Sequence, residues 1–222
     1  MGSMFGTLAK HYSEGGWMMH PILVSLIFTL AVMIDRIIVL YFKAAVDKES
    51  FLRGLKQYVF SGDLDKAIAF CAAQKKVPLV SVIKAGLINV PKGEEDVQAA
   101  MDEATLRESP KIEARTGYLA MLGNVATLLG LLGTIVGLIG AFGAVANANP
   151  ADKATILASS ISEAMNCTAF GLGTGIFGLL IFAILNGQTQ HLLDDINEVT
   201  VELMNLVSAH KQAMKGGGSV AA

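Results

Sequence analysis

Two threonines and one glutamate lie within, or directly beside, stretches of sequence that carry no charge. Thr134 belongs to the uncharged stretch 116–151, Thr168 belongs to the uncharged stretch 164–190, and Glu163 immediately precedes the second. Hydroxyl groups hold and orient protons, whereas a carboxyl group takes them up and releases them. A carboxyl group beside an apolar span is costly and usually faces a partner or a wet cavity. Since no span carries a second carboxylate near its centre, the pattern suggests packed helices with hydroxyls along a seam, not a complete proton relay.

These three residues also have ordinary structural explanations, which the sequence leaves open. Membrane threonines often donate a hydrogen bond to a carbonyl group one turn back in their own helix. Glu163 is also suited to the N-terminus of a helix, where the helix dipole favours negative charge. At helical spacing, Glu163 shares a face with Cys167, Phe170 and Thr174, so its carboxyl group is expected to look along that face.

Small residues recur in both uncharged stretches at intervals of three, four and three residues, all glycines in the first and Thr168 followed by three glycines in the second. This spacing places small residues along one stripe of a helix, which lets membrane helices approach closely. Thr134 lies about 40° from the stripe and therefore borders it. The predicted helix-packing residues are Gly130, Gly133, Gly137, Gly140, Gly171, Gly175 and Gly178.

The chain is all-α by expectation, with three helices long enough to cross a bilayer. It has 222 residues, 53% hydrophobic and 16% charged, which is far less charge than soluble proteins carry. Of its 17 basic residues, 13 lie between Arg36 and Arg115, so the positive-inside rule places that segment in the cytoplasm. The expected segments are an outer N-terminus at 1–16, transmembrane helices at 17–42, 116–151 and 161–190, a helical cytoplasmic domain at 43–115, an outer link at 152–160 and a cytoplasmic tail at 191–222.

Local signals mark the helices of the cytoplasmic segment. Ser61 and Asp63 are candidate caps of a helix that ends before Pro78, and Pro78 is suited to open the next helix. An acidic first turn at Glu94 begins a further helix that we expect to run through Pro110, with a kink, into the second span. The mixed charges of that helix predict a solvated face.

Other classes of function find no support in the sequence. A net charge of −2 gives no reason to expect nucleic-acid binding. Cys71 and Cys167 lie in very different surroundings, so we expect neither a disulfide nor a metal site. The glycines lack the lysine and the strand of a phosphate loop, and no nucleophile and base are recognisable. We therefore expect no cofactor, no metal and no enzymatic activity.

Four motifs resemble those of the MotA/TolQ/ExbB proton channel family, in the same order along the chain. They are "EGGWMMHPILVSLIFTLAVMIDRI" at 14–37, "SGDLDKAIAFC" at 61–71, "LGLLGTIVGLIGAF" at 129–142 and "ISEAMNCTAFGLGTGI" at 161–176. Three spans and this length resemble the TolQ/ExbB branch. One departure is Phe177, which stands where the family commonly has proline.

The resemblance implies a subunit of a bacterial inner-membrane motor, with its N-terminus in the periplasm and its C-terminus in the cytoplasm. Such subunits form a homo-oligomeric ring, usually a pentamer, around a single-span TolR/ExbD-type partner that supplies an intramembrane aspartate. By position in the motifs, Thr134, Thr168 and Glu163 are expected to line the lumen of the ring. The proton motive force would then energise transport, envelope integrity or motility, through a TonB- or TolA-like protein. A different possibility is a non-conducting membrane scaffold.

Overall fold

The computed structural model describes residues 12, 15–44, 47–61, 63–74 and 77–217, and every regular element within them is a helix. This confirms the all-α prediction. Three helical segments are long and apolar enough to cross a membrane, at Met19–Phe42, Glu94–Ala146 and Lys153–Ala209. The elements are α2 (Met19–Ile37), the π-helix η1 (Ile38–Lys43), α3 (Lys48–Phe60), α4 (Leu64–Ala73), α5 (Pro78–Asn89), α6 (Glu94–Glu113), α7 (Thr116–Ala146) and α8 (Lys153–Gly217).

The chain forms two compact units. The first combines Met1–Asp35 with Arg115–Ile184, and the second combines Arg36–Ala114 with Leu185–Ala222. Most of α2, all of α7 and the first part of α8 therefore belong to the first unit. Helices α3 to α6 and the rest of α8 belong to the second.

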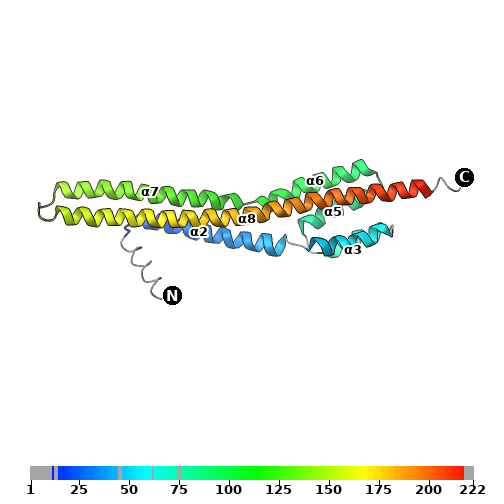
Figure 1. Cartoon of the computed structure of the whole chain (residues 1–222), viewed down its shortest axis with the longest axis horizontal. Helices are drawn as coiled ribbons and strands as arrows, with labels where there is room; N and C mark the ends of the chain where they lie inside the picture. Colours follow the sequence, from blue (N-terminus) through cyan, green and yellow to red (C-terminus); the bar gives the residue numbers. More distant parts are fainter. Residues whose placement is uncertain (1–11, 13–14, 45–46, 62, 75–76, 218–222) are drawn as a thin grey trace. The chain divides into compact units, whose positions relative to one another are not determined.

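The first unit is a bundle in which α2, α7 and the first part of α8 lie side by side (Figure 1). Its core contains Met19, Ile22 and Ala126, each fully buried, together with Cys167 of α8. The hydroxyl group of Ser25 on α2 donates a hydrogen bond of 3.2 Å to the carbonyl oxygen of Leu122 on α7. Apolar packing and one interhelical hydrogen bond thus tie α2 to the other two helices.

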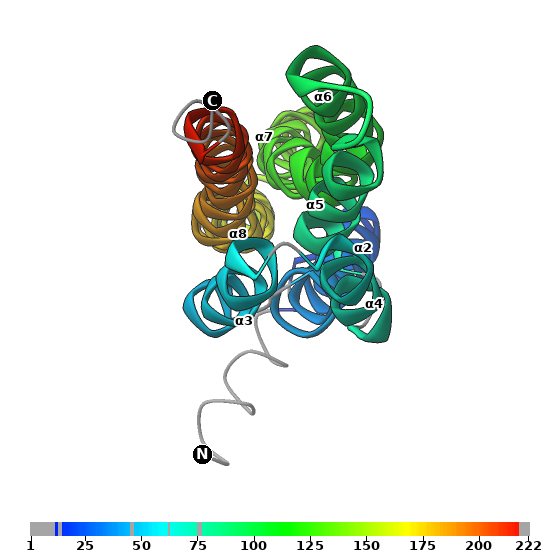
Figure 2. The ribbon, with the colours of Figure 1, turned by 90° about the vertical axis from the view of Figure 1, so that its right-hand side faces the viewer.

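The second unit packs four shorter helices with the C-terminal part of α8, coloured orange to red in Figure 2. A Cβ atom at Gly86 of α5 would lie 2.7 Å from Met101 of α6 and 3.3 Å from Leu203 of α8, so these three helices meet there. Lys48 of α3 forms ion pairs of 2.8 Å and 2.7 Å with Asp195 and Glu198 of α8. The carboxylates raise the pKa of Lys48, which keeps this link charged at physiological pH.

Three of the helix starts expected in this unit are confirmed. The side chain of Asp63 accepts a hydrogen bond from the backbone N–H of Lys66 at 3.1 Å and caps α4. The Lys66 ammonium group, paired with the Asp63 carboxylate at 2.7 Å, and this backbone bond together lower the pKa of Asp63. Pro78 is the first residue of α5, and α6 begins at Glu94 with an acidic first turn.

The junction between α6 and α7 differs from the prediction of one kinked helix. Pro110 lies inside α6 as expected, but α6 ends at Glu113, and Arg115 adopts a left-handed conformation with φ of 62° before α7 begins. Arg115 pairs with Asp35 of α2 at 3.3 Å within the first unit. Left-handed arginine is unfavourable in isolation, so a tertiary contact of this kind helps to stabilise the break.

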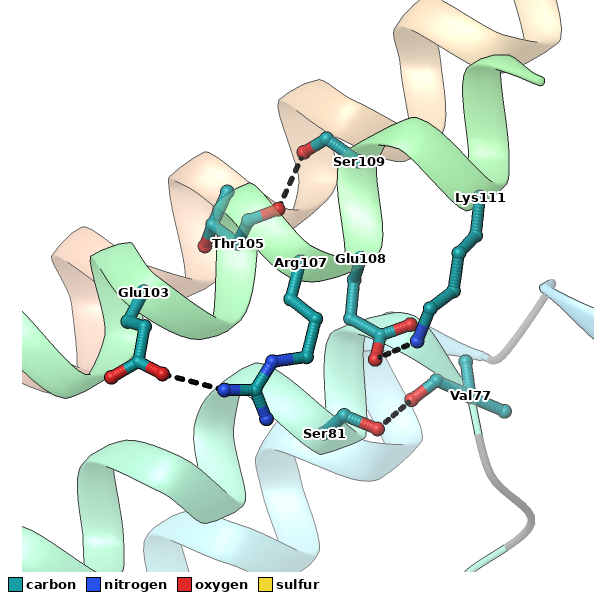
Figure 3. A network of polar contacts seen from close by, with 8 residues as sticks. All are labelled: Val77, Ser81, Glu103, Thr105, Arg107, Glu108, Ser109 and Lys111. Carbon is teal, nitrogen blue, oxygen red and sulfur yellow. Dashed lines mark hydrogen bonds and ion pairs between the residues drawn. The ribbon is translucent and has the colours of Figure 1, made fainter.

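Most charges of α6 lie on a solvated face, as the sequence predicted, whereas the side chain of Glu108 is only 15% exposed. Figure 3 shows Arg107 paired with Glu103 at 2.5 Å and Lys111 paired with Glu108 at 2.6 Å, all within α6. The Arg107 and Glu103 side chains are 66% and 72% exposed. Pairs of this kind, one turn apart, support a helix locally and do not form a binding site.

Helix α8 begins earlier than the expected third span. Its first residue is Lys153, so most of the segment expected as a link at 152–160 is helical, and α8 continues past residue 190 without interruption. The non-helical connection between α7 and α8 therefore covers only 147–152. No proline or glycine pair follows Asp152 closely, which is consistent with the early start.

The thiol group of Cys71 is expected to resist alkylation in the folded protein. Burial within the second unit raises the pKa of Cys71 to about 11, so at pH 8 only about one thousandth of it is the reactive thiolate. We expect a maleimide to modify Cys71 slowly at pH 8 and readily after denaturation, as measured by mass spectrometry of the peptide that contains it. Rapid modification of the folded chain would show that this part of α4 is not packed as described.

Candidate functional site

Gly171 of α8 packs directly against the backbone of α7 at Gly130. A Cβ atom at Gly171 would lie 2.7 Å from the Cα atom of Gly130 and 2.8 Å from the carbonyl oxygen of Ala126. Both neighbours are backbone atoms, which cannot rotate away as a side chain can. Only glycine at position 171 is therefore compatible with this crossing, as expected for closely packed membrane helices.

Most of the other predicted glycines extend this contact along α7 and α8. Positions 133, 137, 175 and 178 each have an atom of the opposite helix within 3.3 Å of where a Cβ atom would stand. Gly140 differs from the prediction, because a Cβ atom there would meet nothing within 4 Å. Gly123, which the sequence analysis missed, packs against α8, because a Cβ atom there would lie 3.0 Å from the carbonyl oxygen of Gly175. It lies seven residues before Gly130, so the same spacing, followed one step further, points to it.

Thr168 connects the two helices at this crossing. Its hydroxyl group donates a hydrogen bond of 2.8 Å to the carbonyl oxygen of Gly130. The bond crosses from α8 to α7, so the explanation that this threonine only bonds its own helix is wrong in this structure. Such a bond requires the two backbones to be close, and Gly130 and Gly171 make that approach possible.

Thr134 behaves as an ordinary membrane threonine within the chain. Its hydroxyl group donates a hydrogen bond of 2.6 Å to the carbonyl oxygen of Leu131, one turn back in α7. Thr127, two turns earlier, makes the same kind of bond to Gly123 at 3.1 Å. Thr134 as a residue is half-buried, and the hydrogen bond of its hydroxyl group is exposed at the surface of the bundle.

Glu163, an exposed residue, lines an open cavity of about 260 Å³ between α7, α8 and the segment before α2. Gly133 and Gly137 of α7 and Cys167 of α8 form other parts of its wall. Gly16 stands directly against the Glu163 carboxylate, so that a Cβ atom there would overlap its Oε1 atom. The φ angle of Gly16 is +69°, a second reason for glycine at this position.

The structure brings Glu163 together with the glycine stripe but separates it from the two threonines. Five residues along a helix turn the side chain by about 140°, so Glu163 and Thr168 lie on different sides of α8. The residues that line the Glu163 cavity in the described part of the chain include neither Thr134 nor Thr168. The candidate site thus has two parts, a hydroxyl bridge at the helix crossing and a carboxylate in a separate cavity.

Comparison with known proteins identifies the family. Residues 74–198, more than half of the 222 residues, match the MotA/TolQ/ExbB proton channel family. The chain belongs to this family and is a membrane protein. The matched region contains α5, α6, α7 and both parts of the candidate site. No curated protein matches the chain significantly.

Proposed function

We propose that this protein is the ring-forming subunit of a TolQ/ExbB-type motor in a bacterial inner membrane, driven by the proton motive force. The observation that carries the proposal is the polar content of α7 and α8, which form the centre of the matched family region. These helices offer the hydroxyls of Thr134 and Thr168 and, near one end, the carboxyl of Glu163. The stretches 116–151 and 164–190 of these helices carry no charged residue, so a titrating carboxylate must come from elsewhere.

That group is proposed to be an aspartate on the single helix of a TolR/ExbD-type partner inside a homo-oligomeric ring, a pentamer by family resemblance. Thr134 and Thr168 then give this aspartate polar neighbours in the lumen, and Glu163 serves protons near the lumen's mouth. The concentration of basic residues between Arg36 and Arg115 supports an orientation with the second unit in the cytoplasm and the α7–α8 link in the periplasm. A TonB- or TolA-like protein would transmit the force to transport, envelope maintenance or motility.

The proposal predicts that the subunit alone conducts almost no protons. Crossing about 30 Å of hydrocarbon requires titrating groups or continuous water, and hydroxyl groups near neutral pH do not store protons. We expect proteoliposomes containing only this chain to be nearly silent in a pH-dye flux assay. Co-reconstitution with a single-span TolR/ExbD-type partner should produce flux, and replacing the partner's intramembrane aspartate by asparagine should abolish it.

Glu163→Gln is a matched variant within the same assay, because glutamine keeps the size of the side chain and removes its titration. Partner-dependent flux should fall, while the variant assembles normally in native mass spectrometry. Strong flux without a partner would contradict the division of labour between the two proteins. An assembled complex that conducts nothing under a membrane potential, with or without the partner, would favour the non-conducting scaffold.

A further inference from the structure

An open groove of about 430 Å³ lies between α2 and α8 within the first unit. Leu26 of α2 forms one part of its wall, and one face of α8 forms the rest. The residues of α8 that line it are Asn166, Ala169, Phe170, Gly173, Thr174 and Phe177. In contrast to the cavity beside Glu163, no ionisable side chain of the described residues lines this groove.

Gly173 keeps the groove open. It lines the groove, and a Cβ atom at this position would meet nothing within 4 Å. Phe170 and Phe177 line the same face of α8 about one turn before and one turn after it. Phe177, which stands where the family commonly has proline, is the last residue of α8 in this wall. Apolar side chains thus flank an open position, which favours an apolar ligand.

The groove covers one half of the membrane-spanning part of the bundle. Phe177 is the central residue of the uncharged stretch 164–190, and Leu26 lies beside the centre of the apolar run 17–34. Asn166 lies closer to the α7–α8 link, about 16 Å from Phe177 along the helix axis. Each leaflet supplies about half of the ~30 Å hydrocarbon core, so the groove has the length of one leaflet.

Polar and aromatic groups mark the end of the groove toward the α7–α8 link. Asn166 is half-buried there, and its side chain forms no hydrogen bond with the described part of the chain. Tyr12 packs edge-on against Phe170 with ring centroids 6.2 Å apart, and its ring lies 5.8 Å from that of His20. Tyrosine is typical of the membrane–water interface, so this end lies at the level where acyl chains meet headgroups.

The width of the groove distinguishes between a lipid chain and a helix of another protein. A volume of about 430 Å³ along about 16 Å corresponds to a mean cross-section of about 27 Å². A helix about 10 Å in diameter has about three times that cross-section. A single hydrocarbon chain therefore fits within the groove, and a whole helix does not.

We infer that this groove binds one acyl chain of a phospholipid from the leaflet on the side of the membrane that carries the α7–α8 link. The chain lies along α8 from Asn166 to Phe177, and the amide group of Asn166 donates a hydrogen bond to the ester carbonyl group at its head. Tyr12 and His20 lie at the level of the headgroup. This role requires only that the chain spans a membrane, so it goes beyond the proposed proton function and does not depend on it.

A photoreactive phospholipid tests this site in the full-length protein. The protein would be reconstituted in phosphatidylethanolamine vesicles that contain a trace of the same lipid with a diazirine at the end of one acyl chain. Peptide mass spectrometry then locates the cross-links. We expect Phe177 to be labelled several-fold more than Ile176, which lies at the same depth and is 58% exposed on another face of α8.

Gly173→Leu should fill the groove, with Gly187→Leu as the matched control on the same helix. Position 187 is equally open but does not line the groove. Gly173→Leu is expected to lower labelling of Phe177 by about tenfold, because the leucine side chain displaces about two methylene groups of the lipid. Labelling of Ile176 should not change in either variant, and Gly187→Leu should leave Phe177 labelled as before.

Two further variants distinguish a lipid chain from a polar occupant. Asn166→Leu removes the donor to the ester carbonyl group and should lower labelling of Phe177 by about fivefold, the effect of losing one hydrogen bond. Thr174 also lines the groove, about 5 Å from Phe177 along the axis, where an acyl chain offers only methylene groups. Thr174→Val should therefore leave the labelling unchanged.

Three results would overturn the lipid site. Phe177 could be labelled no more than Ile176, Gly173→Leu could leave its labelling unchanged, or Thr174→Val could lower it as much as Asn166→Leu does. The last result would show an occupant with a polar group at the depth of Thr174, such as a helix of a second copy. Should Gly173→Leu fail to fold, Asn166→Leu and Thr174→Val still decide the question. Each of these results can occur while partner-dependent flux persists, so the groove and the proposed function are tested separately.

Discussion

Gly171→Ala is expected to separate α7 from α8 and to lower the stability of the first unit by about 1–3 kcal/mol, the usual cost of overpacking a close contact. The added methyl group would stand 2.7 Å from the Cα atom of Gly130 and 2.8 Å from the carbonyl oxygen of Ala126. Neither atom can move without displacing a helix. The thermal midpoint of the purified full-length protein, measured in detergent, should therefore fall by several degrees.

Gly173→Ala is the matched control, two residues further along the same helix. A Cβ atom at Gly173 would meet nothing within 4 Å, so alanine there should be neutral or slightly stabilising through its higher helix propensity. The two variants have identical composition and differ only in the face of α8 that changes. Equal thermal midpoints for the two would show that the close approach at Gly171 does not contribute to stability.

The features that the sequence predicted well depend on local chemistry. The cap at Asp63, the helix start at Pro78 and the acidic turn at Glu94 each follow from one side chain acting on its own backbone. The glycine stripe was predictable for a related reason, because it requires only the period of a helix. Gly140 makes no such contact within the chain, and Gly123 was missed, because periodicity alone does not show which small residues face a neighbouring helix.

Features that depend on the register of one helix against another could not be predicted. Nothing in the sequence around Thr168 indicates that its hydroxyl group bonds Gly130, 38 residues away, and not its own helix. The left-handed Arg115 was also unexpected, because that conformation normally calls for glycine or asparagine. In both cases a tertiary contact overrides the local preference. Helical period placed Glu163 on one face with Cys167, and both residues line the same cavity.

Thr168→Val is expected to reduce partner-dependent proton flux by about tenfold, which corresponds to ~1.4 kcal/mol in the barrier. This energy lies near the upper end of the ~0.6–1.7 kcal/mol found for interhelical hydrogen bonds in membranes. Valine keeps the volume of the side chain and replaces the hydroxyl group by a methyl group. The 2.8 Å bond to the carbonyl oxygen of Gly130 is lost, and a methyl group cannot approach an oxygen that closely. Helices α7 and α8 must therefore move slightly apart, and the thermal midpoint should fall together with the flux.

Thr168→Ser and Thr134→Val separate the structural contribution of a hydroxyl group from its contribution to proton movement. Serine at 168 keeps the interhelical bond and should restore both flux and stability. Thr134 bonds only Leu131 of its own helix, so Thr134→Val should leave the thermal midpoint almost unchanged. If Thr134 lines the lumen, flux should nevertheless decrease, because the partner's aspartate loses a polar neighbour. Unchanged flux in Thr134→Val would assign that threonine to its helix alone, and unchanged flux in Thr168→Val would show that the bridge at the helix crossing does not serve conduction.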